Sequence, residues 1–172
     1  MKELLIVWHS RTGAAQQLAE AAELGALQTA AALEHADTFR VRRLPAQDTQ
    51  GVDLLAADGM VFCAPENLGS LSGEMKAFFD RSYYAVLDRV AGRPYGMAVS
   101  AGTDGHGAAR QIERICTGWR LKLISPALIA CTGAQTPEAI LAPKELAPQA
   151  RTSAEELGGL LAATLLLGAG SA

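Results

Sequence analysis

Residues 4–15 have the sequence LLIVWHSRTGAA, in which an apolar run is followed directly by small and hydroxyl-bearing residues. The apolar run predicts a buried β-strand over residues 3–8, and the Ala-rich segment after it predicts a helix over 14–33. A loop between a strand and a helix start leaves backbone N–H groups free at the positive end of the helix dipole. Such loops bind anions, most often phosphate. An ordinary capped strand–turn–helix joint is the alternative interpretation.

The residues of this loop support the anion-binding interpretation. Ser10 and Thr12 can add hydroxyl donors to a bound anion. Gly13 allows the backbone to approach closely, and Arg11 brings a positive charge. His9 ends the strand, and we expect it to be neutral and bonded to loop backbone. The loop therefore predicts a phosphate site.

Composition limits the class of protein. A chain of 172 residues suits one domain with a single core. Hydrophobic residues make up 49% of it and charged residues 19%, as in globular proteins. The net charge of −3 and the lack of a basic stripe argue against nucleic-acid binding. Arg40, Arg42 and Arg43 do cluster, but alternation around them predicts solvated side chains on a strand.

Cysteine usage and the chain ends indicate a cytoplasmic protein without a membrane segment. Cys63, Cys116 and Cys131 stand in apolar surroundings and are odd in number, which predicts buried free thiols in a reducing compartment. No Cys or His spacing predicts a metal site, and no signal peptide is expected. The apolar tail, residues 157–170, is too short to span a bilayer. We expect it to be a packed or interface helix, and we expect a homodimer.

Strand-like and helix-like patterns alternate along the rest of the chain. The third strand is predicted to end at Pro65, and Gly25 is a candidate interruption of the first helix. Further strands are predicted at 38–43, 59–64, 95–100 and within 121–131. Further helices are predicted within 46–57 and at 73–90, 108–118 and 152–167, and residues 132–151 are predicted to be irregular.

Five apolar strands alternating with helices predict an α/β fold, with a five-stranded parallel sheet covered by helices on both faces. In such sheets ligands bind beyond the carboxyl ends of the strands. The first, third and fourth strands all end in loops rich in Gly, Ser or Pro, at residues 10–15, 65–69 and 101–107. We expect these three loops to face one crevice.

The chain resembles the flavodoxin-like superfamily, particularly its NAD(P)H:quinone oxidoreductases and NADPH-dependent FMN reductases. Residues 9–15 are similar to the loop that holds the FMN phosphate in that family. Similarity is strongest around the third strand and the helix after it, and the resemblance covers roughly residues 1–130. The residues that carry it there are Asp58-Gly59-Met60-Val61-Phe62, Pro65, Gly69, Ser72-Gly73, Met75-Lys76-Ala77-Phe78 and Asp80-Arg81.

The resemblance implies one flavodoxin-like three-layer domain over residues 1–172, with strand order 2-1-3-4-5. It implies FMN as cofactor, NAD(P)H as co-substrate and a small acceptor such as a quinone. No catalytic side chain and no metal are implied, because the flavin carries the chemistry. The residues implied to contact FMN are Ser10, Arg11, Thr12, Gly13, Ala14 and Ala15, then Pro65, Glu66, Asn67, Leu68 and Gly69, and then Ala101, Gly102, Thr103, Asp104 and His106.

Three positions depart from the family pattern. Ala15 stands where the family usually has a hydroxyl, and Glu66 and Asn67 stand where it commonly has Thr and an aromatic residue. Loss of aromatic stacking is worth about 0.5–1.5 kcal/mol. A carboxylate beside the ring would oppose an anionic reduced flavin. Two alternatives therefore stay open, a fold kept for binding or assembly with a degenerate flavin site, and an electron-carrier flavodoxin.

Overall fold

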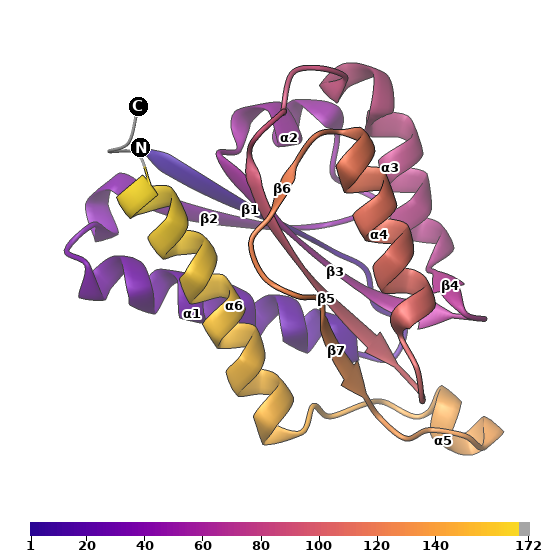
Figure 1. Cartoon of the computed structure of the whole chain (residues 1–172). Helices are drawn as coiled ribbons and strands as arrows, with labels where there is room; N and C mark the ends of the chain where they lie inside the picture. Colours follow the sequence, from indigo (N-terminus) through magenta and orange to yellow (C-terminus); the bar gives the residue numbers. More distant parts are fainter. Residues whose placement is uncertain (169–172) are drawn as a thin grey trace.

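Seven strands form one sheet within residues 1–168, the part of the chain that the computed structural model describes (Figure 1). The main path across this sheet is β2-β1-β3-β5-β6. The strands are β1 (Lys2–Trp8), β2 (Phe39–Pro45), β3 (Gly59–Asn67), β4 (Ser70–Leu71), β5 (Pro94–Ala101), β6 (Lys122–Leu123) and β7 (Leu128–Cys131). The helices are α1 (Ala14–Ala32), the short 3₁₀ helix η1 (Ala36–Thr38), α2 (Gly51–Ala56), α3 (Gly73–Val86), α4 (His106–Gly118), α5 (Pro137–Leu141) and α6 (Pro148–Leu167).

The main path of the sheet is parallel, and β4 runs antiparallel beside the end of β3. β6 and β7 both pair with β5, so they are two halves of the fifth predicted strand. Pro126 lies in the break between them, where it has no N–H to donate to a neighbouring strand. The predicted parallel sheet and its order 2-1-3-4-5 are therefore confirmed.

The apolar run near the start of the chain forms the centre of the sheet. β1 lies between β2 and β3, and its residues 4–7 are fully buried. Successive side chains of this run alternate between the cores on the two faces of the sheet. Because both faces are covered, the strand is continuously apolar instead of alternating with polar residues.

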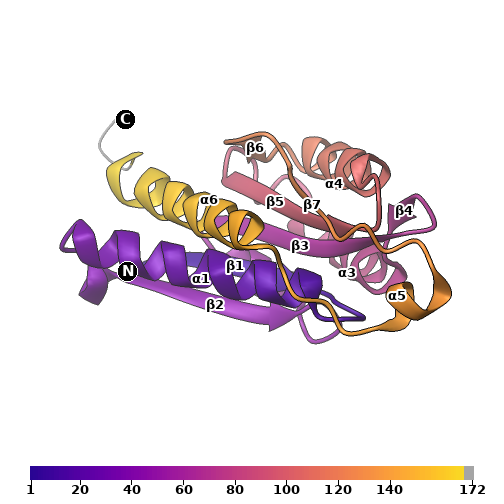
Figure 2. The same ribbon diagram turned by 90° about the horizontal axis from the view of Figure 1, so that it is seen from below.

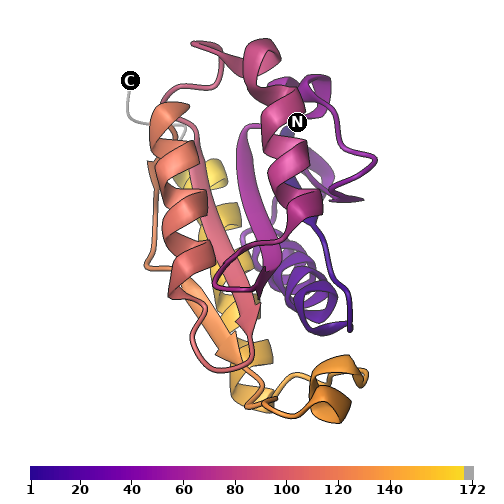
Figure 3. The same ribbon diagram turned by 90° about the vertical axis from the view of Figure 1, so that its right-hand side faces the viewer.

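Helices cover both faces of the sheet (Figures 2 and 3). α1 and α6 lie side by side and share one core with β1 and β3. α2, α3 and α4 share the core on the opposite face. The predicted apolar helix 152–167 lies within α6 and packs on α1, while residues 169 and 170 of the predicted apolar tail fall outside the described residues. Across residues 1–168, no helix has the length and apolar character needed to cross a membrane.

A long connection, residues 132–147, runs from the end of β7 to the start of α6, and we call it the strap. It includes α5, which lies beyond the carboxyl ends of β5 and β7 (Figures 1 and 3). The Lys144 N–H donates to the Thr12 carbonyl at 2.7 Å, and the Gln17 side chain donates to the Lys144 carbonyl at 2.6 Å. The strap is therefore bound to the loop that follows β1.

Several predicted boundaries are wrong for identifiable reasons. Gly25 does not interrupt α1, because the backbone of α6 packs against it. β3 continues past Pro65 to Asn67, because β4 pairs with its end. α3 ends at Val86 and not at residue 90, since Asp88 adopts a left-handed conformation with φ 58°.

The later part of the chain is more regular than predicted. β5 extends through Ala101 and α4 begins at His106, so the predicted loop 101–107 is reduced to residues 102–105. Residues 132–151 were predicted to be irregular, yet they contain α5 and the start of α6. Both helices have Pro in the first turn, where its missing N–H costs no intrahelical bond.

The basic residues of β2 are paired with acids; Arg40 is 55% exposed, as predicted for a solvated side chain, whereas Arg42 and Arg43 are half-buried. Arg40 and Arg42 both form ion pairs with Glu3, whose side chain is only 3% exposed. Arg43 pairs with Glu23 at 2.6 Å. A buried carboxylate needs such partners, and the alternation of residues along one strand does not reveal them.

Two of the three cysteines are buried as predicted, and the third is not. Cys63 and Cys116 lie in the cores, whereas Cys131 is exposed at the end of β7. Burial raises the pKa of the Cys63 thiol to about 12, so this sulfur stays protonated at neutral pH. The three thiols are free, and the part of the chain described here holds no group of His, Cys, Asp or Glu side chains able to bind a metal ion.

The backbones of α1 and α6 are in direct contact at a glycine of each helix. A Cβ atom at Gly25 would lie 2.0 Å from the Glu155 carbonyl oxygen, and one at Gly158 would lie 1.8 Å from the Ala22 carbonyl oxygen. Real Cβ atoms essentially never come so close to another atom. The absence of a side chain at these positions therefore sets how closely the two helices pack.

We predict that Gly158→Ala lowers the free energy of unfolding by about 1–3 kcal/mol, because the helices must separate to admit the methyl group. Gly118→Ala is the matched control, since a Cβ at the end of α4 meets no atom within 4 Å. We expect the control to leave stability unchanged or raise it by up to about 1 kcal/mol. Urea unfolding followed by circular dichroism measures both variants, and equal stabilities would contradict the close contact.

Candidate functional site

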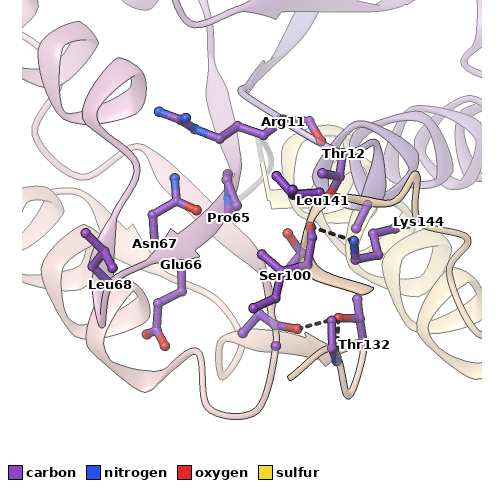
Figure 4. Close-up of a pocket in the computed structure, with 16 residues that line it drawn as sticks. Arg11, Thr12, Pro65, Glu66, Asn67, Leu68, Ser100, Thr132, Leu141 and Lys144 are labelled. Carbon is purple, nitrogen blue, oxygen red and sulfur yellow. Dashed lines mark hydrogen bonds between the residues drawn. The ribbon is translucent and has the colours of Figure 1, made fainter. Parts of the chain in front are cut away.

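A cavity of about 860 Å³ opens at the carboxyl ends of the central strands (Figure 4). This volume lies within the range of small-molecule sites, roughly 300–1,000 Å³. The loop after β1, the end of β3 with its hairpin, the end of β5 and the strap all contribute to its wall. The lining residues are Ser10, Arg11, Thr12, Ala14, Pro65, Glu66, Asn67, Leu68, Ser100, Ala101, Gly102, Thr132, Ala134, Ile140, Leu141 and Lys144.

The first wall is the turn that joins β1 to α1. Gly13 is the N-cap of α1 and has φ 99°, a left-handed conformation that L side chains rarely adopt. The Gly13 N–H donates to the Ser10 hydroxyl at 3.0 Å, which closes the turn. Because α1 begins at Ala14, its first N–H groups have no intrahelical carbonyl to bind. These donors and the helix dipole favour an anion at this wall of the cavity.

His9 lies under this turn on the opposite face of the sheet from α1, in a polar chain that runs to α3. Its Nδ1 is 2.9 Å from the Ser72 hydroxyl, and its Nε2 is 3.5 Å from Glu74 Oε2. A neutral imidazole has one donor, and a carboxylate can only accept, so the Nε2 proton faces Glu74 and Ser72 donates to Nδ1. The prediction that His9 bonds to backbone through its ring is wrong.

Burial and neighbouring charges determine the protonation states of His9 and Glu74. Burial lowers the pKa of His9, and the Arg11 charge adds to that effect, while Glu74 opposes it. The pKa of Glu74 is lowered by its own backbone N–H and also by the Arg11 charge, while burial opposes the shift. His9 is therefore neutral and Glu74 ionised at neutral pH. Ser72 is fully buried and does not line the cavity, so this Ser–His–Glu chain is not a nucleophilic triad.

The second wall is a hairpin and not the loop that was predicted for residues 65–69. Glu66 and Asn67 at the end of β3 pair with β4. The Gln111 side-chain oxygen of α4 accepts from the Ser70 hydroxyl at 2.9 Å and from the Leu71 N–H at 2.8 Å, which anchors the hairpin. Leu68 sits at the tip with φ 53° and is fully exposed.

Glu66 does not present a free charge to the cavity. Its two carboxylate oxygens accept from the Gly105 N–H at 2.9 Å and the Ala108 N–H at 3.0 Å, at the start of α4. Figure 4 shows its carboxylate directed away from Arg11 and Thr12. The carboxylate thus caps a helix whose dipole favours negative charge. The expectation that it repels a reduced flavin does not follow from this geometry.

The structure brings ten of the sixteen predicted site residues into the cavity wall, and the other six lie outside it. Ala15 is fully buried in the core, so its side chain does not reach the cavity. Of the predicted third loop, residues 101–107, only Ala101 and Gly102 line the cavity, and Thr103, Asp104 and His106 do not. Gly13 and Gly69 do not line it either, although they shape the first turn and the hairpin.

Six lining residues were missed by the sequence analysis. Ser100 ends β5, just before the predicted third loop. The others are Thr132, Ala134, Ile140, Leu141 and Lys144, all in the strap. One signal in the sequence was available, because the strap leaves a strand at the same edge of the sheet as the three predicted loops. Its return to the first loop depends on Gln17, 127 residues from Lys144, which no local pattern reveals.

Comparisons with known proteins agree with this architecture. A family model described as NADPH-dependent FMN reductase matches residues 13–134. The chain is 38% identical over 68 residues to the Arabidopsis thaliana protein named "Probable NAD(P)H dehydrogenase (quinone) FQR1-like 2". Those residues are 39% of this chain and 25% of that protein, so the match spans a quarter of the relative's length.

Solved structures with low sequence identity share the fold. An archaeal flavodoxin has a TM-score of 0.73 at 15% identity, over 95% of this chain and 98% of that one. An oxidoreductase from Corynebacterium diphtheriae has a TM-score of 0.73 at 19% identity, over 97% and 98%. A WrbA-like flavodoxin from Agrobacterium tumefaciens has a TM-score of 0.64 at 16% identity, over 94% and 98%.

These likenesses confirm the predicted flavodoxin-like fold, because the strand order and the flanking helices coincide over nearly the whole chain. The family model covers well over half of the sequence, beginning at Gly13, the last residue of the first turn, and including the hairpin and the end of β7. The resemblance predicted from the residues of these segments is likewise confirmed. The chain therefore belongs to the NADPH-dependent FMN reductase family.

Proposed function

We propose that the cavity binds FMN and that the protein is an FMN-dependent NAD(P)H oxidoreductase acting on a quinone or another small acceptor. The observation that carries this proposal is the convergence on one cavity of the segments at the carboxyl ends of β1, β3 and β5, represented by Thr12, Pro65 and Ala101. Membership of the FMN reductase family supports it. The partial similarity to a plant protein named as a quinone dehydrogenase supports the choice of acceptor.

The residues that line the cavity fit this cofactor. The free N–H groups at the start of α1 suit the phosphate, with the hydroxyls of Ser10 and Thr12 beside them. Pro65 and the backbone of Ala101 and Gly102 would lie along the ring. The one carboxylate of the wall, on Glu66, is occupied by two backbone N–H groups and leaves the cavity suited to an anion.

When bound, FMN supplies the redox chemistry, accepting hydride from NAD(P)H and passing electrons to the acceptor. The protein's own task is to bind and orient the cofactor and to limit the access of water. The sixteen lining residues include no His or Cys, so the cavity offers neither a histidine base nor a thiol. No side chain is needed as a general base for a direct hydride transfer.

A fold kept only for binding or assembly is the weaker proposal. The reason for this alternative is that Ala15, Glu66 and Asn67 depart from the family pattern. Ala15 is buried in the core, and the Glu66 carboxylate is bound to α4. Of the three departures, only Asn67 presents a changed side chain to the cavity. The other alternative is an electron carrier. Such a protein would bind FMN but, unlike a reductase, would not be reduced by NADPH.

We predict that the purified apoprotein takes up FMN stoichiometrically and that NADPH or NADH bleaches the flavin absorbance near the visible maximum. Adding a quinone should restore the colour, because the acceptor reoxidises the flavin. Absorbance and fluorescence titrations measure both steps. Protein that binds FMN but does not respond to NADPH or NADH would be a carrier, and protein that binds no FMN would overturn the proposal.

The conformation of Gly13 gives a second prediction. Gly13→Ala is expected to weaken FMN binding about tenfold or more, because a left-handed conformation is unfavourable for Ala and the phosphate turn must rearrange. Gly92→Ala is the matched control, since Gly92 has φ 79° and lies in a turn outside the cavity wall. Both variants should lose similar stability, but only Gly13→Ala should lose affinity. Equal FMN affinities would place the phosphate elsewhere.

The hydrogen-bonded chain of His9, Ser72 and Glu74, in which His9 and Ser72 are buried, holds the same turn from below. Glu74 Oε1 lies 3.4 Å from Arg11 Nη2, so α3 holds both ends of the segment 9–11. The pKa of His9 is lowered in the folded protein. As the pH falls below the ordinary histidine value of 6.5, the unfolded chain therefore binds more protons than the folded protein does. Stability from this source is therefore full above that pH and lost as the pH falls.

We predict that the free energy of unfolding decreases from pH 6.5 to pH 5, with a further loss near and below pH 4.5 as Glu74 becomes protonated. His9→Gln should flatten the first decrease. His35→Gln, on the exposed turn before β2, controls for the loss of one histidine. Urea unfolding at each pH measures the slopes, and an unchanged slope in His9→Gln would show that another group is responsible.

A further inference from the structure

The strap is bound to the first turn of the cavity by several hydrogen bonds. Thr12 accepts from the Lys144 N–H, and Gln17 spans the gap with both ends of its amide. The Gln17 Nε2 donates to the Lys144 carbonyl at 2.6 Å, and the Gln17 Oε1 accepts from the Leu146 N–H at 3.2 Å. The backbone around Lys144 is thus fixed against the turn that presents the free N–H groups of α1.

Hydrogen bonds within the strap fix the orientation of the Lys144 side chain in the cavity wall. It lines the cavity, and its ammonium donates to the carbonyl of Ile140 at 3.0 Å and to that of Ala142, at the end of α5 (Figure 4). An ammonium group has three N–H donors. Two are used by the strap, and one is left for a ligand.

The charges around the cavity leave Lys144 without a carboxylate partner. Arg11 and Lys144 are the two cations among the lining residues. Arg11 pairs with Glu74, and its side chain is 63% exposed. Glu66, the acid of the wall, is bound to the start of α4. Within residues 1–168, no Asp or Glu lies in ion-pair distance of the Lys144 ammonium.

We propose that Lys144 is a direct ligand of the terminal phosphate of the bound flavin nucleotide, so that the strap forms a fourth wall of the site. This inference rests on the proposed function. The lysine adds a charge-assisted hydrogen bond to the backbone donors of α1. It supplies, from the strap, a positively charged side chain beside the backbone donors of the first turn.

The test compares FMN with riboflavin, which has the same ring but no phosphate. Lys144→Gln is expected to weaken FMN binding about tenfold, to leave riboflavin binding unchanged and to reduce the salt dependence of FMN affinity. Lys144→Arg should keep most of the FMN affinity. Lys122→Gln, on β6 and outside the cavity wall, removes an equal charge and should change neither affinity. Flavin fluorescence quenching measures each affinity, and thermal unfolding checks that each variant folds.

The outcomes separate this inference from the proposed function. If the wild-type protein binds neither flavin, the proposed function fails and the inference fails with it. If the wild-type protein prefers FMN and Lys144→Gln keeps that preference, the proposed function stands and the inference is wrong. If Lys144→Gln weakens FMN and riboflavin equally, the lysine only holds the strap in place, which also overturns the inference.

Discussion

Burial of β1 on both faces is the constraint on which the rest of the structure depends. Residues 4–7 lie at the centre of the sheet between two cores, so α1 and α6 must cover one face and α2, α3 and α4 the other. Polar backbone can then meet water or a ligand only at the edges and ends of the strands. The carboxyl ends are the place where the chain turns into α1, into the hairpin and into α4. The cavity follows from this arrangement and not from any single loop.

Local patterns were sufficient for the fold and for the position of three walls. The apolar runs predicted the parallel sheet, and the small residues after β1, β3 and β5 predicted that ligand-binding segments converge. What local patterns could not predict are contacts between distant segments. Gln111 turns a predicted loop into a hairpin, Gln17 brings the strap to the first turn, and Glu3 recruits the arginines of β2. Each depends on one polar side chain whose partner lies far away in the sequence.

Glu66 illustrates why a departure from a family pattern needs its tertiary partners before it is interpreted. On the sequence alone, a carboxylate at this place is an obstacle to an anionic cofactor. In the structure, the same carboxylate satisfies two N–H groups at the start of α4 and joins the end of β3 to that helix. Gly107 completes the junction, because a Cβ there would lie 2.0 Å from the Gly69 carbonyl oxygen. The residue is thus part of the scaffold that holds two walls together.

The hydrogen bonds of Gln17 have a consequence for the order in which the molecule is completed during synthesis. The turn after β1 leaves the ribosome well before its partners Lys144 and Leu146, because 127 residues separate Gln17 from Lys144. The central strands and α1 can assemble while translation continues, but the turn acquires its full set of bonds only after the strap has been synthesised. A chain cut off before the strap would therefore lack one wall of the cavity and the partners of the first turn.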